Sequence, residues 1–294
     1  MKFEIVKYHL ENLYLIKGDE NQHFGAIYSG MDWSNNQKVI LKKVAKTNLK
    51  GIEAVYREFS FQLNTSFFPE IIDLIENENE ILLLSKFKEG ERLDTFWKSI
   101  KKKDQISTLK EIVTALGPLM GYLEKERIAH CDIKPSNILV QKKENHLELA
   151  LIDFGLGMPH YFQGERKLRF PLGYAAPELI LNHLDLVNQK TDVYAIGVMI
   201  WRLLSDKMPL HHPNPSIYTN LQLNLELPDN DNISKQLLQI LNKASKKHNF
   251  RIPPNLMKVE DVKQNLENAI NERSSFQILH ADILELPERK RWFF

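Results

Sequence analysis

The sequence predicts an α+β protein in two unequal parts, followed by a tail. Residues 1–87 are predicted to form a small β-rich part with one main helix, residues 88–272 a larger and mostly helical part, and residues 273–294 the tail. The strand prediction rests on alternating or apolar runs: Leu13–Lys17, Phe24–Gly30 and Lys38–Val44. The helix prediction rests on apolar residues at helical spacing: Ile106–Arg127, Thr191–Ser205, Ile233–Lys246 and Val259–Asn271.

The elements of the first part follow one another in a definite order. Ser34–Gln37 supplies the polar turn between the second and third strands. The main helix follows the third strand and includes Val55–Leu63. Ile81–Leu93 then supplies the last strand and the connection to the second part. A short apolar run fits any buried strand, so this last assignment rests on its place in the order.

The second part contains one helix that is predicted to be buried on all sides. Its apolar stretch, Val193–Trp201, ends at Arg202 and is too short to span a bilayer. Asp192 at the start of this helix suits the positive end of the helix dipole. We therefore expect a central buried helix and no membrane span.

Composition bears on the class of function. The 294 residues carry 39 basic and 38 acidic side chains, a net charge of +1, which gives no overall case for a nucleic-acid or membrane-surface partner. The N-terminus lacks the continuous apolar core of a signal peptide. The single cysteine, Cys131, cannot form an internal disulfide, which suits a reducing compartment. These features predict a cytoplasmic protein, with delivery into another cell left open.

Two short segments concentrate the residues that can carry chemistry. His130–Asn137 has the sequence HCDIKPSN, and Leu151–Gly155 has the sequence LIDFG. Together they supply two carboxylates, a lysine and an amide. Phosphoryl transfer from a nucleotide needs such a set, because one group must orient the attacking hydroxyl and oxygen ligands must hold the Mg²⁺ that neutralises the phosphates.

The order and spacing of these segments resemble the catalytic loop and DFG segment of eukaryotic-type protein kinases. The resemblance implies a two-lobe kinase fold, ATP as the donor and a protein as the substrate. It implies that Asp132 orients the acceptor hydroxyl and that Lys134 stabilises charge on the transferred group. It further implies that Asn137 and Asp153 hold Mg²⁺.

Matches to the same family continue downstream. Gly173–Glu178, GYAAPE, resembles the end of a kinase activation segment, and the resemblance implies that Arg251 pairs with Glu178. It also implies that Asp192 holds the backbone of the catalytic loop. Gly155 is expected to permit the sharp turn that starts the activation segment.

Matches upstream point to the nucleotide. Lys42, on the third strand, aligns with the lysine that binds the α- and β-phosphates in the family. Its partner should be a glutamate of the main helix. Glu58 is the better candidate, and Glu53, about one turn earlier, is the competitor.

The adenine pocket is expected at the connection between the two parts. The resemblance places Ser85 at the back of this pocket and the backbone around Lys86–Lys88 against the adenine edge, with Lys86 and Lys88 as the named contacts. This assignment follows from the order of the motifs.

The phosphate-covering loop departs from the family pattern of three glycines. Gly25 matches the last glycine, and Gly18 is the other glycine available. Asp19 and Glu20 lie between them and would repel phosphates. This departure is the main argument for a nucleotide-binding pseudokinase scaffold as the alternative function.

Two departures bear on regulation. Cys131 stands where regulated kinases have an arginine that pairs with a loop phosphate. The segment Asp153–Glu178 contains no serine or threonine, and its hydroxyls belong to Tyr161 and Tyr174. We therefore expect activity that does not depend on loop Ser/Thr phosphorylation, with constitutive activity or control by a partner protein or by the tail as the alternatives.

The remaining departures bear on the substrate. Pro171 replaces the threonine that is usual before the end of the segment, whereas Lys134 follows the Ser/Thr-kinase version of the catalytic loop. We expect phosphorylation of Ser/Thr. Arg166, Lys167 and Arg169 would either favour acidic residues near the acceptor or remain solvated.

A small-molecule kinase is the less favoured alternative, because such enzymes generally lack the APE segment and its arginine partner. The tail ends in ERKRWFF, an aromatic end on a basic stretch. It would either dock on the body of the protein or on a partner, or fray as termini commonly do.

Overall fold

The computed structural model describes residues 3–5, 8–19, 25–63, 65–164, 166, 170–248, 250 and 252–287. The chain divides into two compact units. Unit 1 comprises residues 1–90, 150–157 and 166–168, and unit 2 comprises residues 91–149, 158–165 and 169–294. Two short segments from the middle of the chain thus return to unit 1.

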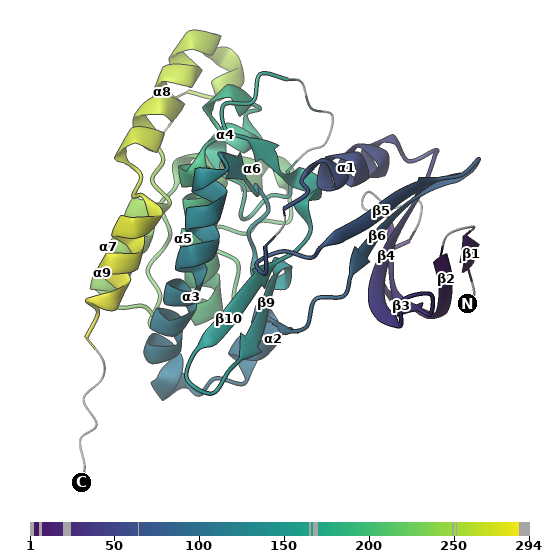
Figure 1. Cartoon of the computed structure of the whole chain (residues 1–294). Helices are drawn as coiled ribbons and strands as arrows, with labels where there is room; N and C mark the ends of the chain where they lie inside the picture. Colours follow the sequence, from purple (N-terminus) through teal and green to yellow (C-terminus); the bar gives the residue numbers. More distant parts are fainter. Residues whose placement is uncertain are drawn as a thin grey trace. The chain divides into compact units, whose positions relative to one another are not determined.

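Unit 1 is built on an antiparallel sheet (Figure 1). Its described residues form six strands in the order β1-β2-β3-β4-β6-β5. The strands are β1 (Phe3–Ile5), β2 (Tyr8–Lys17), β3 (Ala26–Asp32), β4 (Gln37–Ala45), β5 (Ile71–Glu76) and β6 (Glu80–Lys86), and helix α1 (Leu49–Ser60) follows β4. Asn48 caps α1 by accepting a hydrogen bond from the Gly51 N–H at 3.0 Å.

The two faces of this sheet bury different sets of residues, because side chains alternate along a strand. One face buries Leu41 of β4 with Leu82 and Leu84 of β6. The other buries Val44, Ile81 and Leu83 with Val55 of α1. Lys42 alternates with Leu41, so it lies on the face that α1 covers.

Unit 2 is mainly helical, as predicted (Figure 1). Its helices are α2 (Leu93–Lys98), α3 (Gln105–Lys125), α4 (Pro177–Ile180), α5 (Gln189–Ser205), α6 (Pro215–Asn224), α7 (Lys235–Ala244), α8 (Val259–Glu272) and α9 (Phe276–Leu284). Helices α3, α5, α7 and α8 match the four helices predicted from spacing to within two residues at each end. Short strands form the orders β10-β9-β7 and β11-β8; they are β7 (Glu91–Arg92), β8 (Ile128–Ala129), β9 (Ile138–Lys142), β10 (Leu147–Leu151) and β11 (Met158–Pro159).

Helix α5 is the central buried helix of unit 2. Every residue of α5 is buried except Lys190 and Arg202, which are half-buried. A capping box at Asn188 and Thr191 starts the helix. Across the part of the chain that the structure describes, no helix combines the length and the apolar character needed to cross a membrane.

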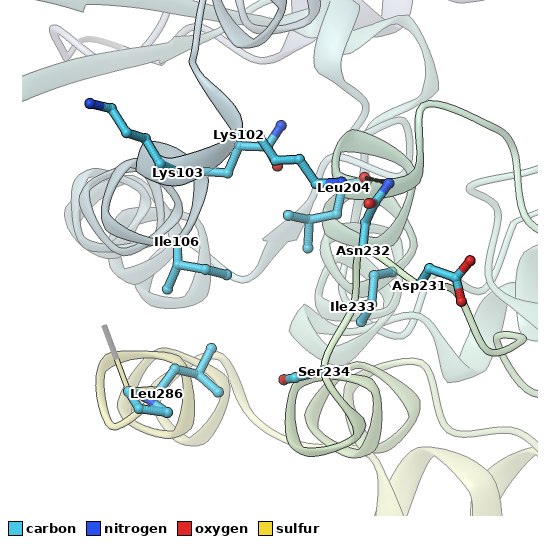
Figure 2. Close-up of a pocket in the computed structure, with 11 residues that line it drawn as sticks. Lys102, Lys103, Ile106, Leu204, Asp231, Asn232, Ile233, Ser234 and Leu286 are labelled. Carbon is cyan, nitrogen blue, oxygen red and sulfur yellow. Dashed lines mark hydrogen bonds between the residues drawn. The ribbon is translucent and has the colours of Figure 1, made fainter. Parts of the chain in front are cut away.

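The segment after α8 folds into unit 2. Helix α9 packs on α3 and α7 and buries Phe276, Leu279 and Ile283 (Figure 1). Beyond it, Leu286 lines a pocket of about 370 Å³ together with Lys102, Ile106 and other residues (Figure 2). Residues 288–294, which include the aromatic end of the predicted tail, lie outside the described residues.

Candidate active site

Unit 1 contributes a buried lysine between two carboxylates. Lys42 is 6% exposed, and its Nζ donates hydrogen bonds to the Glu58 carboxylate and, at 3.0 Å, to Asp153 Oδ1. Glu53 is not a partner of Lys42: its Oε1 lies 3.5 Å from Arg57 and 3.7 Å from Arg166. Of the two glutamates that the sequence offered, Glu58 therefore makes the contact.

The charges of this group stabilise one another. Burial disfavours the cationic form of Lys42, but the carboxylates of Asp153 and Glu58 overcome this effect and hold its pKa above the ordinary lysine value. Burial also raises the pKa of Glu58. A cation fixed in this way is suited to bind phosphate oxygens.

The backbone at Asp153 is strained. Its φ of +69° lies in the left-handed region, which non-glycine residues rarely adopt. Gly155, to which the sequence assigned the sharp turn, lies in the tight 3-10 turn Phe154–Leu156 but has no positive φ, so the left-handed residue of this segment is Asp153. Gly155 matters through close packing, since an added Cβ would lie 3.1 Å from the Ala54 Cβ. Strained residues persist where the surrounding structure holds them, often at functional sites.

Phe154 anchors this segment within unit 1. It is buried, and its ring centroid lies 5.8 Å from that of Phe61 and 5.1 Å from that of Phe68. Aromatic pairs at such distances add stability beyond the area they bury. The packing of Phe154 therefore holds in place the backbone that carries the Asp153 carboxylate.

The two glycines predicted to flank the phosphates lie next to each other in unit 1. Gly18 has a φ of +83° and Gly25 a φ of +71°. An added Cβ on Gly18 would lie 2.3 Å from the Gly25 carbonyl oxygen, and one on Gly25 would lie 2.3 Å from the Lys43 carbonyl oxygen. Both positions therefore require glycine. Residues 20–24 between them, including Glu20, lie outside the described residues.

The predicted adenine contacts lie at the end of β6 and just beyond it. Ser85 is buried in β6. The Lys86 N–H donates to the Glu70 carbonyl at 2.9 Å, and the Phe87 N–H donates to the Lys38 carbonyl at 3.0 Å. Among the described residues, no hydrogen bond engages the Lys88 N–H. Of these three donors, Lys88 is thus the one available to a ligand.

Unit 2 contributes a second polar group on the loop after β8. Lys134 Nζ donates to Asp132 Oδ2 at 2.6 Å, and Asn137 Nδ2 donates to the same oxygen at 2.9 Å. Asn137 Nδ2 also donates to the Asp132 carbonyl at 2.9 Å. Within the described residues, Asn137 Oδ1 accepts no hydrogen bond, so this oxygen can serve a metal ion.

Asp192 at the start of α5 holds the backbone of this loop. Its carboxylate accepts the His130 N–H at 2.8 Å and the Cys131 N–H at 2.9 Å. Burial raises the pKa of Asp192 to about 7, and the two N–H donors oppose the rise. Cys131 is buried, forms no disulfide and has a φ of +61°, so the loop is strained immediately before Asp132.

A buried ion pair ties Glu178 to the end of α8. Arg273 donates to both oxygens of Glu178, at 2.8 and 3.2 Å, and both side chains are fully buried. Thr191 donates to Glu178 at 2.9 Å. Arg251, the expected partner, lies outside the described residues. The arginine found on Glu178 is Arg273, which sequence reasoning missed because no spacing rule marks it.

Arg166 lies inside unit 1 rather than on a substrate surface. Its guanidinium donates to the carbonyls of Leu156 at 2.8 Å and Gly155 at 3.0 Å. Its side chain is fully buried, so the expectation that Arg166 is solvated or faces a substrate was wrong. Lys167 and Arg169 lie outside the described residues.

The donor set fits Mg²⁺. In the described part of the chain, no three His, Cys, Asp or Glu side chains gather at one point as a ready-made metal site. Mg²⁺ does not require such a cluster, because it keeps waters and takes one or two protein oxygens together with substrate phosphates. The Asn137 amide oxygen in unit 2 and the Asp153 carboxylate in unit 1 are hard oxygen donors of the kind it prefers.

A β-rich unit with a lysine–carboxylate group and a helical unit with an aspartate–lysine–asparagine loop are the parts that nucleotide-dependent phosphotransferases combine. Residues 22–284 match the family model described as "Protein kinase domain". The chain therefore belongs to the protein kinase family, and its fold is the two-lobe kinase fold, with the β-rich lobe first. Members of this family use ATP and Mg²⁺.

The similar curated proteins are protein kinases. Myosin light chain kinase 2 (skeletal/cardiac muscle) of Rattus norvegicus is 30% identical over 193 residues, which is 63% of this chain and 30% of that protein. Serine/threonine-protein kinase dkf-2 of Caenorhabditis briggsae is 25% identical over 68% of this chain and 17% of its own length. Myosin light chain kinase A of Dictyostelium discoideum is 28% identical over 75% of this chain and 77% of its own length. The chain thus spans less than a third of the first two relatives.

Proposed function

We propose that the protein transfers the γ-phosphate of ATP to serine or threonine hydroxyls of a protein substrate. The observation that carries this proposal is the loop on which Asp132 Oδ2 accepts from both Lys134 and Asn137. Asp132 would orient the acceptor hydroxyl and accept its proton as transfer proceeds. Lys134, 2.6 Å from the same oxygen, would stabilise negative charge on the group in transit.

The nucleotide would be held mainly by unit 1. Lys42, which Glu58 and Asp153 keep charged, would bind the α- and β-phosphates. Asp153 and Asn137 would each supply an oxygen to Mg²⁺, which when bound neutralises phosphate charge. The Lys88 N–H, near Ser85, would receive the adenine edge.

The choice of Ser/Thr rests on the catalytic loop and the relatives. Lys134 follows the Ser/Thr-kinase version of the loop, and one relative is named a serine/threonine-protein kinase. The Glu178–Arg273 pair supports a protein kinase over a small-molecule kinase, because the pair fixes the end of an activation segment that small-molecule kinases generally lack.

We further propose that activity does not require Ser/Thr phosphorylation of the activation segment. Residues 153–178 contain no serine or threonine, and Cys131 cannot bind a phosphate as an arginine would. Arg166 supplies contacts that would order the activation segment, since it donates to the Leu156 and Gly155 carbonyls and lies 3.7 Å from Glu53 of α1. Control would then come from a partner protein or from the tail. A cytoplasmic location fits the buried Cys131, which forms no disulfide.

The test is phosphate transfer from ATP with Mg²⁺, measured by intact-protein mass and by transfer to a mixture of protein substrates. Asp132→Asn should abolish transfer, whereas Asp206→Asn, a matched change at an exposed residue of unit 2, should not. Phosphate found only on serine or threonine supports the proposal. Activity that vanishes after treatment with a tyrosine phosphatase would contradict control by a partner protein or by the tail, and would point to phosphorylation of Tyr161 or Tyr174.

A nucleotide-binding scaffold is the second candidate, because the loop between Gly18 and Gly25 departs from the family pattern. ATP that raises the melting temperature without any transfer to substrate would favour the scaffold and reject the kinase.

A further inference from the structure

A polar pocket of about 440 Å³ opens beside the catalytic loop, entirely within unit 2. Its lining includes Lys134 and Ser136 of that loop, Tyr174 of the GYAAPE segment, Arg202 of α5 and Asp94 of α2. Because Lys134 Nζ lies 2.6 Å from Asp132 Oδ2, a chain that occupies this pocket lies next to the proposed acceptor position.

Arg202 is the unusual member of this lining. Helix α5 is buried apart from Lys190 and Arg202. Lys190 is engaged at the other end of the helix, where its Nζ donates to the carbonyls of Ile270 and Asn271, each at 3.0 Å. Arg202, by contrast, faces the pocket.

The charge of Arg202 is not neutralised by a carboxylate. Among the described residues, no carboxylate lies within ion-pair distance of its guanidinium. Its near neighbour is the Tyr174 phenol: burial raises the pKa of Tyr174 to about 12, and Arg202 opposes that rise. A neutral phenol leaves the positive charge of Arg202 directed to the pocket.

The other ionisable groups that line the pocket do not neutralise the positive charge of Arg202. Lys134 is committed to Asp132. His211 stacks on Tyr218 at 5.3 Å between ring centroids. Asp94 is the carboxylate that lines the pocket, and its Oδ1 accepts the Thr95 N–H at 3.0 Å. Apart from Lys134, the pocket lining therefore presents one cation, Arg202, and one carboxylate, Asp94, which form no ion pair with each other, so Arg202 stays open to an acidic group of a ligand.

We propose that Arg202 forms a subsite for an acidic side chain of the protein substrate, close to the acceptor residue. The inference rests on the proposed kinase activity and names its substrate class. A planar guanidinium binds a carboxylate through two parallel N–H···O bonds, which fixes direction as well as charge. Arg202 would thus select substrates in which Asp or Glu lies near the phosphorylated residue, a role that the sequence had offered to Arg166, Lys167 and Arg169.

The experiment compares kcat/KM for peptides with one central serine. In one series an aspartate is scanned through every flanking position, and in the matched series an asparagine replaces it. The full chain is used as wild type, Arg202→Gln and Arg202→Glu. Arg202→Gln keeps a hydrogen-bond donor toward Tyr174 and removes only the charge. Lys207→Glu, an exposed change of the same sign outside the pocket, is the control.

We expect wild type to prefer aspartate at one or more positions by about tenfold, which corresponds to about 1.4 kcal/mol. The preference should shrink as salt is raised, because the pair is partly exposed. Arg202→Gln should abolish it, Arg202→Glu should reverse it so that asparagine is preferred over aspartate, and Lys207→Glu should leave it unchanged. A purely structural role for Arg202 would instead lower the rate for all peptides alike.

Two results would overturn the inference and differ in what they say of the proposed function. Wild type that phosphorylates all peptides equally, or an acidic preference that survives in Arg202→Gln, would remove the subsite and leave the kinase intact. No transfer to any peptide or protein, with ATP still bound, would remove both.

Discussion

Replacing Arg273 with methionine should be among the most damaging single changes to unit 2. The guanidinium makes five hydrogen bonds: two to Glu178, two to the Lys246 carbonyl and one to the Lys190 carbonyl. It also lies 5.1 Å from the centroid of the Tyr194 ring. Methionine fills part of the volume but leaves a fully buried carboxylate whose remaining donor, among the described residues, is Thr191.

The magnitude follows from the burial of both partners. Breaking a buried ion pair by removing one partner costs about 3–5 kcal/mol, because the other charge stays buried without compensation. Adding Glu178→Gln to Arg273→Met removes that orphaned charge. The double variant should therefore recover about 1–3 kcal/mol of the loss.

The assay is urea unfolding of the full chain followed by tryptophan fluorescence. Trp97 and Trp201 are both buried in unit 2, so their signal reports the unit that contains the pair. Arg251→Met is the matched control, because Arg251 is the arginine that the sequence pattern favoured as the partner of Glu178. A loss below about 1 kcal/mol for Arg273→Met, or a larger loss for Arg251→Met, would refute the assignment.

Three further changes test other parts of the structure. Burial lowers the pKa of Lys247 to about 7. Above that pH the unfolded chain binds more protons than the folded chain, so the free energy of unfolding should rise from about pH 7 to 10. Lys247→Met should flatten this rise in urea titrations across pH. Gly25→Ala should lower the free energy of unfolding by about 1–3 kcal/mol, because the φ of Gly25 is +71° and the new Cβ would lie 2.3 Å from a carbonyl oxygen. Gly121→Ala, at an exposed position of α3 with no atom within 4 Å, should instead raise it by up to about 1 kcal/mol in the same urea-unfolding experiment. Lys42→Met should weaken ATP binding, measured by calorimetry with Mg²⁺, at least tenfold (about 1.4 kcal/mol), and equal affinity in wild type and variant would contradict the phosphate role of Lys42.

Much of the fold was predictable from local pattern. Apolar spacing located α3, α5, α7 and α8, and the all-apolar stretch of α5 identified a buried helix. Helices α2 and α4 are too short to show periodicity, and the apolar residues of α6 and α9 are less confined to one face than those of α7, so these four helices carried no such signal. Family membership was also predictable, since the catalytic motifs are contiguous in sequence.

The partners of the site residues were predictable only where few choices existed. For Lys42 the sequence offered Glu53 and Glu58, and the rotation of α1 on the sheet decides for Glu58. For Glu178 the sequence pattern pointed to Arg251, which lies outside the described residues, and the structure shows a contact with Arg273 that the pattern did not indicate.

The sequence alone determined the class of protein, the two-part architecture and the loop that bears Asp132, because each depends on residues that are neighbours along the chain. Only the tertiary structure decided that Arg273 neutralises Glu178, that Arg166 is buried against the Gly155 and Leu156 carbonyls, and that Arg202 faces a pocket beside Lys134. The physical reason is that a charged side chain takes its role from whichever groups surround it after folding. Those groups come from distant parts of the chain, and their burial and geometry are set by packing that no local pattern records.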